Sequence, residues 1–137
     1  MLQNREQILE KFAALEAIDP MMLEQIRMLR QLQTEDEEDI LVELIGLFIE
    51  DTPPKLQMLR QTFTEKDRNL FARTAHSLKG SSGNLGASQM MEICSFLENE
   101  GRGEELESLA PFIDLLEKSY ERVKAIFEVE RTRSIEN

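Results

Sequence analysis

The single histidine of this 137-residue chain, His76, lies in the stretch TAHSLKGSSGNLGA, residues 74–87. Successive residues of a helix turn by about 100°, and small and apolar residues recur here at helical spacing. That spacing predicts a core-facing stripe made of Phe71, Ala75, Leu78, Ser82 and Leu85. His76 is roughly 130° from the centre of this stripe, so we expect it to face water. Lys79, Gly80 and Gly83 follow at offsets of three, four and seven residues and share its face.

An exposed imidazole beside cations is a nucleophile suited to accept a phosphoryl group from another protein. Lys79, with Arg73 on the preceding turn, would offset the arriving negative charge. Exposed helical glycines cost roughly 1 kcal/mol each relative to alanine. Because Gly80 and Gly83 are expected to gain no packing there, we interpret them as clearance for a large partner. The alternative is an ordinary solvated histidine followed by helix-ending glycines, of which Gly86 is the expected stop.

Composition excludes several other classes of protein. The 27 acidic and 16 basic residues give a net charge of −11 without a basic patch, so nucleic acid is not an expected partner. No run of about 18 apolar residues predicts a membrane span, and the charged N-terminus does not resemble a secretory signal. Cys94 cannot form an internal disulfide, and it falls on an apolar stripe, which argues against a Cys/His nucleophile pair. A reducing cytoplasm is the expected compartment, and no residue spacing predicts a metal site in the chain.

Most of the chain has helical periodicity, with short breaks between the segments. Asp19 is the expected cap of a helix that begins at Pro20. Thr34 or Asp36 is the expected cap of the next helix, and Ser88 is the expected cap of a later helix. Pro53-Pro54 should kink one helix without ending a domain, and Leu44 is placed on its buried stripe. The expected helices cover residues 4–17, from 20 onward, 34–63, 69–85, 89–100 and 104–130.

Helices joined by short connections imply an all-α fold, an antiparallel up-down four-helix bundle with one or two additional N-terminal helices. Residues 1–18 are expected to form an amphipathic helical extension that packs on the bundle, mediates dimerisation or adds a docking surface. Residues 19–130 would form the bundle and residues 131–137 a frayed tail. A monomer is expected, with a dimer through the N-terminal helix as the alternative.

The stretch AHSLKGSSGNLGA resembles the signature of histidine-containing phosphotransfer (HPt) domains, which is approximately A-H-x-L-K-G-x-x-x-x-L-G. The similarity extends upstream through ELIGLFIEDTPPKLQMLRQTF and downstream through MMEICSFLEN and YERVKAIF, covering about residues 19–128. The doubled proline at 53–54 departs from the family pattern, and the first 18 residues have no counterpart in it.

The resemblance implies a phosphorelay intermediate that accepts a phosphoryl group on His76 from a receiver-domain aspartate and passes it to another receiver domain. Lys79 would stabilise the phosphoryl group, and Gly80 would leave the ring accessible. Glu98 falls where many members carry Gln or Glu, and it would hold the other ring nitrogen and fix the tautomer. The alternative for Glu98 is an ordinary glutamate at the edge of a helix stripe.

The resemblance also implies a carrier rather than an enzyme, with no cofactor of its own. The receiver would supply the aspartate, a cation and Mg²⁺. Implied partners are receiver domains of response regulators and hybrid sensor kinases. An adjoining helix would contribute apolar residues to the docking surface. The other docking residues would be Arg73, Ser77, Gly80, Ser81, Gly83 and Asn84.

A helical adaptor that binds receivers without being phosphorylated is the alternative function, although the intact H-x-x-K-G argues against it. A chain that opens with Met and forms one domain is expected to be a free-standing carrier, with a piece of a larger kinase as the alternative.

Overall fold

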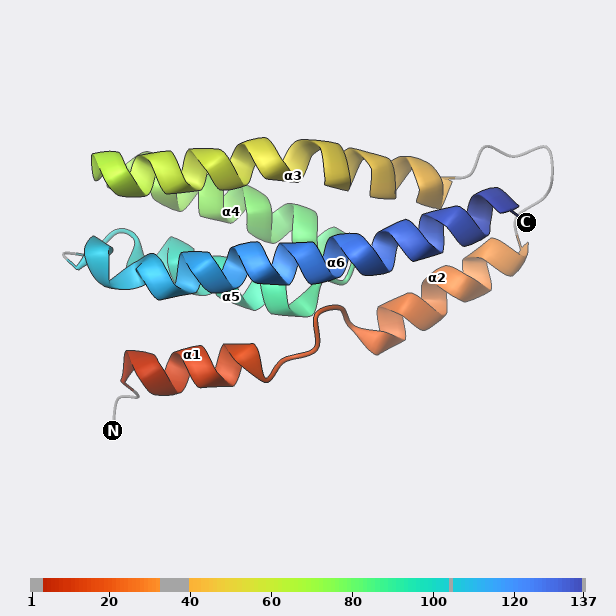
Figure 1. The fold of residues 1–137 in the computed structure, drawn as a ribbon, viewed down its shortest axis with the longest axis horizontal. Coiled ribbons are helices and arrows are strands. Elements are labelled where there is room, and N and C mark those ends of the chain that lie inside the picture. Colours follow the sequence, from red (N-terminus) through yellow and green to blue (C-terminus); the bar gives the residue numbers. More distant parts are fainter. Residues whose placement is uncertain (1–3, 33–39, 104, 137) are drawn as a thin grey trace.

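The computed structural model describes residues 4–32, 40–103 and 105–136, and within these ranges every regular element is helical. The predicted all-α bundle is confirmed: α3, α4, α5 and α6 form a ring in which each helix packs on the next and α6 returns to α3 (Figure 1). Tight connections between α3, α4 and α5 reverse the chain direction. The elements are α1 (Arg5–Ala13), α2 (Pro20–Leu32), α3 (Ile40–Glu65), α4 (Arg68–Asn84), α5 (Ser88–Glu100), the 3₁₀ turn η1 (Leu106–Leu109) and α6 (Ala110–Glu136).

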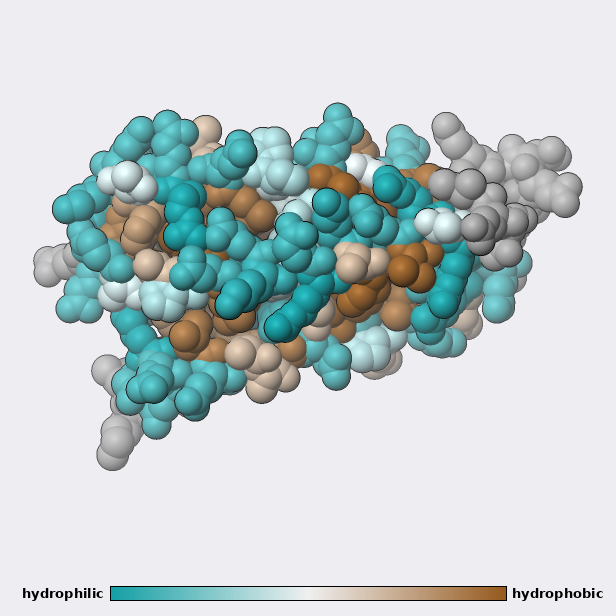
Figure 2. All heavy atoms as spheres, in the orientation of Figure 1, coloured by the Kyte–Doolittle hydropathy of each residue, from teal (hydrophilic) through white to brown (hydrophobic). Residues whose placement is uncertain are grey.

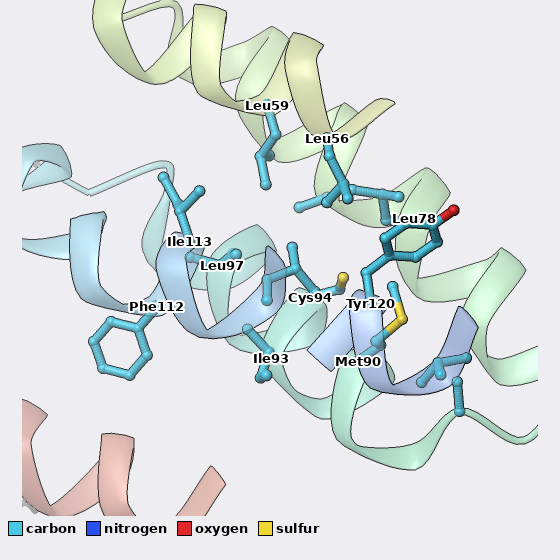
Figure 3. Close-up of a cluster of buried hydrophobic side chains, with 14 of the residues drawn as sticks. Leu56, Leu59, Leu78, Met90, Ile93, Cys94, Leu97, Phe112, Ile113 and Tyr120 are labelled. Carbon is cyan, nitrogen blue, oxygen red and sulfur yellow. The ribbon is translucent and has the colours of Figure 1, made fainter. Parts of the chain in front are cut away.

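The core fills the space between the four bundle helices. Figure 3 shows Leu59 of α3, Leu78 of α4 and Ile113 of α6 converging on the α5 side chains. Cys94 is fully buried among them, as predicted, and its burial raises the pKa of the thiol far above the usual range, so it is no nucleophile. The face of the molecule drawn in Figure 2 is mostly hydrophilic, with scattered apolar patches. Among the described residues, no helix combines the length and the apolar character needed to cross a membrane.

The first helix, α1, packs on α5 and α6 through one aromatic anchor. The ring centroid of Phe12 lies 5.5 Å from that of Phe96 and 6.2 Å from that of Phe112, in edge-to-face arrangements. The buried Gln89 side chain donates to the Phe12 carbonyl at 3.0 Å. In the described structure, α1 therefore takes the packing role, one of the three considered for residues 1–18.

The second helix begins at Pro20 as predicted, with the Asp19 carboxylate accepting from the Met21 backbone N–H at 2.9 Å. Further along α2, Arg30 binds α6 through two hydrogen bonds. One of its guanidinium nitrogens donates to the Glu130 carboxylate at 3.1 Å and the other to the Glu130 carbonyl at 3.2 Å. Glu130, where we placed the end of the last helix, is buried in this contact, and α6 continues to Glu136. The helix therefore continues past residue 130, where we placed its end, while the fraying of residues 131–137 stays a prediction.

The doubled proline lies inside α3, which continues through it as one helix; the predicted continuation is confirmed, and the kink stays a prediction. Pro53 has no backbone N–H, so the Ile49 carbonyl one turn earlier loses its helical partner. The Tyr120 hydroxyl of α6 donates to that carbonyl at 3.2 Å. A side chain from a neighbouring helix thus satisfies the carbonyl that the proline leaves free.

Two local predictions are wrong. Leu44 is 46% exposed, because the buried row of α3 runs back from Phe48 to Ile45, three residues earlier, instead of four. Ser88 does not cap α5: it is the first helical residue, and its hydroxyl lies 3.4 Å from the Gly86 carbonyl. The predicted caps at Thr34 and Asp36 fall outside the described residues.

Candidate functional site

Helix α4 holds His76 at the surface of the bundle. The Asp67 side chain caps the start of the helix by accepting from the Leu70 N–H at 3.2 Å. Gly86, with a φ of 74°, follows its end, as predicted. The predicted stripe from Phe71 to Leu85 is buried, and the His76 side chain is 66% exposed. The outward orientation of His76 is thereby confirmed.

The other half of the site comes from α5. Its buried residues Met90, Ile93 and Leu97 fix the rotation of the helix, and this rotation puts Glu98 at the edge that borders α4. One carboxylate oxygen of Glu98 lies 2.8 Å from Nδ1 of His76, and the other accepts from Lys79 Nζ at 2.8 Å. The structure thus brings together the three residues to which the sequence analysis gave chemical roles.

Glu98 is a charged acceptor despite being only 14% exposed. The hydrogen bond from Lys79 lowers the pKa of Glu98 most; partial burial opposes this effect, and the contact with His76 adds to the lowering. A carboxylate can only accept hydrogen bonds, so Nδ1 of His76 must carry the hydrogen. In the neutral ring the lone pair is then on Nε2, at the opposite edge of the imidazole.

The two glycines near His76 have different surroundings. A Cβ added to Gly80 would meet no atom within 4 Å, so packing within the chain does not require this glycine. A Cβ on Gly83 would lie 3.1 Å from the Met91 sulfur of α5. The prediction that Gly83 gains no packing is therefore wrong, because Gly83 lets the two helices approach closely at this point.

The other predicted docking residues lie along the seam between α4 and α3, beside two surface hollows. The first, here called the basic hollow, has a volume of about 400 Å³ and is lined by Pro54, Lys55, Met58, Leu70, Arg73 and Ser77. The second, the acidic hollow, has a volume of about 170 Å³ and is lined by Leu44, Leu47, Asp51, Ser81, Asn84 and Leu85. Helix α3 is the adjoining helix that offers apolar residues beside the predicted docking residues.

The sequence analysis did not find the α3 residues of these hollows. Leu44 and Leu47 are about half exposed, and Ile40 at the start of the same row is 66% exposed. Their spacing of i, i+4 and i+7 was the available signal. It marks a second apolar face on α3, beside the buried row through Ile45 and Phe48.

None of the described residues forms a cluster of three or more His, Cys, Asp or Glu side chains that could hold a metal ion. The groups present at the site are an oriented imidazole and an ammonium group beside the same carboxylate. His76 supplies a lone pair on an exposed ring nitrogen, and Lys79 supplies positive charge within one turn of it.

Two comparisons place this arrangement among known proteins. The profile of the Hpt domain family matches residues 43–126, more than half of the chain. The fold is similar to the crystal structure of histidine-containing phosphotransfer protein B (HptB) from Pseudomonas aeruginosa PAO1, with a TM-score of 0.72 and 28% sequence identity. The match covers 88% of this chain and 98% of that one. The chain therefore belongs to the Hpt domain family and is a phosphotransfer intermediate of two-component phosphorelays.

Proposed function

We propose that the chain accepts a phosphoryl group on Nε2 of His76 from the aspartyl phosphate of one receiver domain and delivers it to the aspartate of another. The observation that carries the proposal is the contact of Glu98 with Nδ1 of His76, 2.8 Å long, on a ring that is otherwise open to solvent. This contact leaves the nucleophilic lone pair on the exposed nitrogen.

In the uptake step, the lone pair of Nε2 attacks the phosphorus atom of the receiver's aspartyl phosphate. The N–P bond forms while the P–O bond to the aspartate breaks, and the aspartate leaves as a carboxylate. The imidazole keeps its hydrogen on Nδ1 and gains positive charge, which the Glu98 carboxylate offsets. Delivery to a second receiver is the reverse step, with that receiver's carboxylate as the nucleophile.

Lys79 and Gly80 have complementary roles in this proposal. The ammonium group of Lys79, held 2.8 Å from Glu98, lies where it can offset phosphoryl charge. Gly80 leaves open space one turn after His76, through which the partner's site can reach the ring. The receiver would supply Mg²⁺ and further cations around the phosphoryl group.

Receivers would dock over the exposed face of α4 and its seam with α3. This surface includes Arg73, Ser77, Ser81 and Asn84, together with the apolar residues of the two hollows. Half-exposed leucines beside a group-transfer site are suited to a transient partner, because they bury apolar area when the complex forms.

The test is a transfer assay that uses purified receiver domains phosphorylated beforehand. The wild-type chain should acquire acid-labile, base-stable phosphate and pass it to a second, unphosphorylated receiver. His76→Gln should acquire none while remaining folded. Lys79→Ala should transfer on the order of 10-fold more slowly, since one charge-assisted contact is lost, whereas Lys118→Ala on exposed α6 should match the wild type.

Acid-labile phosphate on the His76→Gln variant would overturn the assignment of the acceptor. Receiver binding without any phosphoryl uptake by the wild-type chain would instead support the adaptor function. Unchanged transfer by Lys79→Ala would remove Lys79 from the site.

A further inference from the structure

We propose that the basic and acidic hollows fix the direction in which a receiver binds, and so select among receivers by charge. The preferred receiver presents a row of apolar side chains. One end of this row enters the basic hollow and has carboxylates beside it. The other end of that row, over the acidic hollow, carries Lys or Arg. This inference rests on the proposed function and adds the chemistry of the partner surface.

The basic hollow is lined by apolar residues and by one cation from each of the two helices. Lys55 belongs to α3 and Arg73 to α4, and Met58 and Leu70 of the same lining are partly exposed. The Lys55 ammonium lies across the seam, with Nζ 3.5 Å from the hydroxyl of Ser81, a residue of the acidic hollow, so this cation lies at the boundary between the two hollows. Of the described residues that line this hollow, none is acidic. A carboxylate beside an apolar side chain of the partner would meet complementary charge on both sides.

The acidic hollow has the opposite sign. Asp51 is the one charged residue among its described lining residues, and Leu44 and Leu47 provide the apolar wall. The C-terminal end of α4, with Asn84, also borders it. The N-terminal turns of α3, with Leu44, border the same hollow, so the opposite partial charges of the two helix ends offset each other and the sign of the hollow rests on Asp51.

The spacing of the hollows sets the length of the partner row. Leu47 and Met58 are eleven residues apart on α3, which corresponds to about 16 Å along a helix. A partner that enters both hollows must therefore present apolar groups over a similar length. If the same row were turned around, its carboxylates would lie over Asp51 and its cations over Lys55 and Arg73.

The basic hollow lies close to the phosphoacceptor on α4. Ser77, which lines the basic hollow, directly follows His76, and Gly80 lies between His76 and the seam on the helix surface. A partner in the hollows can therefore reach the imidazole across Gly80, where a Cβ would meet only open space. The chain has a net charge of −11. The two cations on this seam therefore make part of the docking surface positively charged, in contrast to the molecule as a whole.

The test compares charge reversals on the seam with matched reversals elsewhere. The probe is the receiver from the source organism that phosphorylates the wild-type chain fastest, in a variant whose phosphorylatable aspartate is replaced by Asn. The Lys55→Glu/Arg73→Glu double variant should bind this receiver about 10-fold more weakly at low salt, chiefly through slower association. The difference should nearly vanish at about 0.5 M salt.

The control is Lys118→Glu/Arg122→Glu, which makes the same change of net charge on the exposed surface of α6. It should bind within about 2-fold of the wild type, because exposed charges far from the interface are screened. Lys55→Gln/Arg73→Gln should lose less affinity than the double reversal, and it serves as the second variant if thermal unfolding shows that the reversal disturbs the fold.

Equal losses in the seam and α6 variants, or a loss that persists at high salt, would overturn the charge selection. So would full affinity of a folded Lys55→Glu/Arg73→Glu chain. If transfer to His76 occurs in any of these cases, the proposed function stands and only the polarity of docking fails. If no receiver phosphorylates the wild-type chain, both proposals fail together.

Discussion

Replacing Gly80 by alanine should stabilise the protein and impair its transfer reaction. Glycine within a helix is about 1 kcal/mol less favourable than alanine, and a Cβ at position 80 would meet no atom within 4 Å. Since no clash subtracts from the gain, the free energy of unfolding should rise by nearly that amount. For a chain of this size the melting temperature should increase by about 4 °C.

The same methyl group would occupy space that a receiver needs beside His76. Overpacking a close interface costs roughly 1–3 kcal/mol, which corresponds to about 5- to 150-fold in affinity or rate. We therefore expect Gly80→Ala to slow phosphoryl transfer by at least about 5-fold, and Gly80→Gln to slow it further. Phosphotransfer assays stopped at fixed times would measure the transfer rate, and thermal unfolding of the same preparations would measure the stability.

Gly46 provides the matched control. It lies inside α3, and a Cβ there would have only an ordinary contact, 3.8 Å from a guanidinium nitrogen of Arg131 on α6. Gly46→Ala should therefore give a similar stabilisation and leave transfer unchanged. If Gly80→Ala is stabilised and transfers as fast as the wild type, the clearance role of Gly80 is refuted.

Three further changes test the packing around the site. Gly101→Ala should destabilise the fold by about 1–3 kcal/mol in urea unfolding, because the new Cβ would lie 2.4 Å from the Phe71 ring; an unchanged midpoint would contradict the close contact. Tyr120→Phe should cost about 1 kcal/mol, since the Ile49 carbonyl loses its donor, and no loss of stability would show that the bond contributes nothing. The lowered pKa of Glu98 means that its ionised form stabilises the fold above its ordinary pKa, and that this contribution is lost as pH falls through the lowered value. The stability difference between the wild type and Glu98→Gln should therefore shrink in unfolding titrations from about pH 5 to about pH 3; a difference that grows in this range would contradict it.

The exposure of His76 was predictable because its helix has one unambiguous buried stripe. Every third or fourth residue from Phe71 to Leu85 is small or apolar, so the period alone sets the rotation of α4. Helix α3 was harder, because Leu44 and Ile45 are both apolar and adjacent. Periodicity cannot decide which of two neighbouring apolar rows is buried when the helix uses both, one for the core and one for the surface hollows.

Contacts between segments that are distant in the sequence cannot be predicted from the periodicity of a single helix. The stripe of α5 placed Glu98 at a helix edge, but its distance to His76 depends on how α5 packs on α4, and the residue was singled out through the family resemblance. The contact of Glu130 in α6 with Arg30, 100 positions away in the sequence, likewise depends on how α2 packs. Gly83 was misread for the same reason, since only the packed pair of helices reveals Met91 beside it.

The most direct test of the proposed chemistry is to determine which atom of the phosphorylated chain carries phosphorus. The ¹⁵N-labelled protein, phosphorylated by a receiver, can be studied by ¹⁵N and ³¹P NMR to identify the nitrogen bonded to phosphorus. With Nδ1 held at 2.8 Å by Glu98, we predict a phosphoryl group on Nε2 of His76. Phosphorus on Nδ1, or on any residue other than His76, would contradict the mechanism.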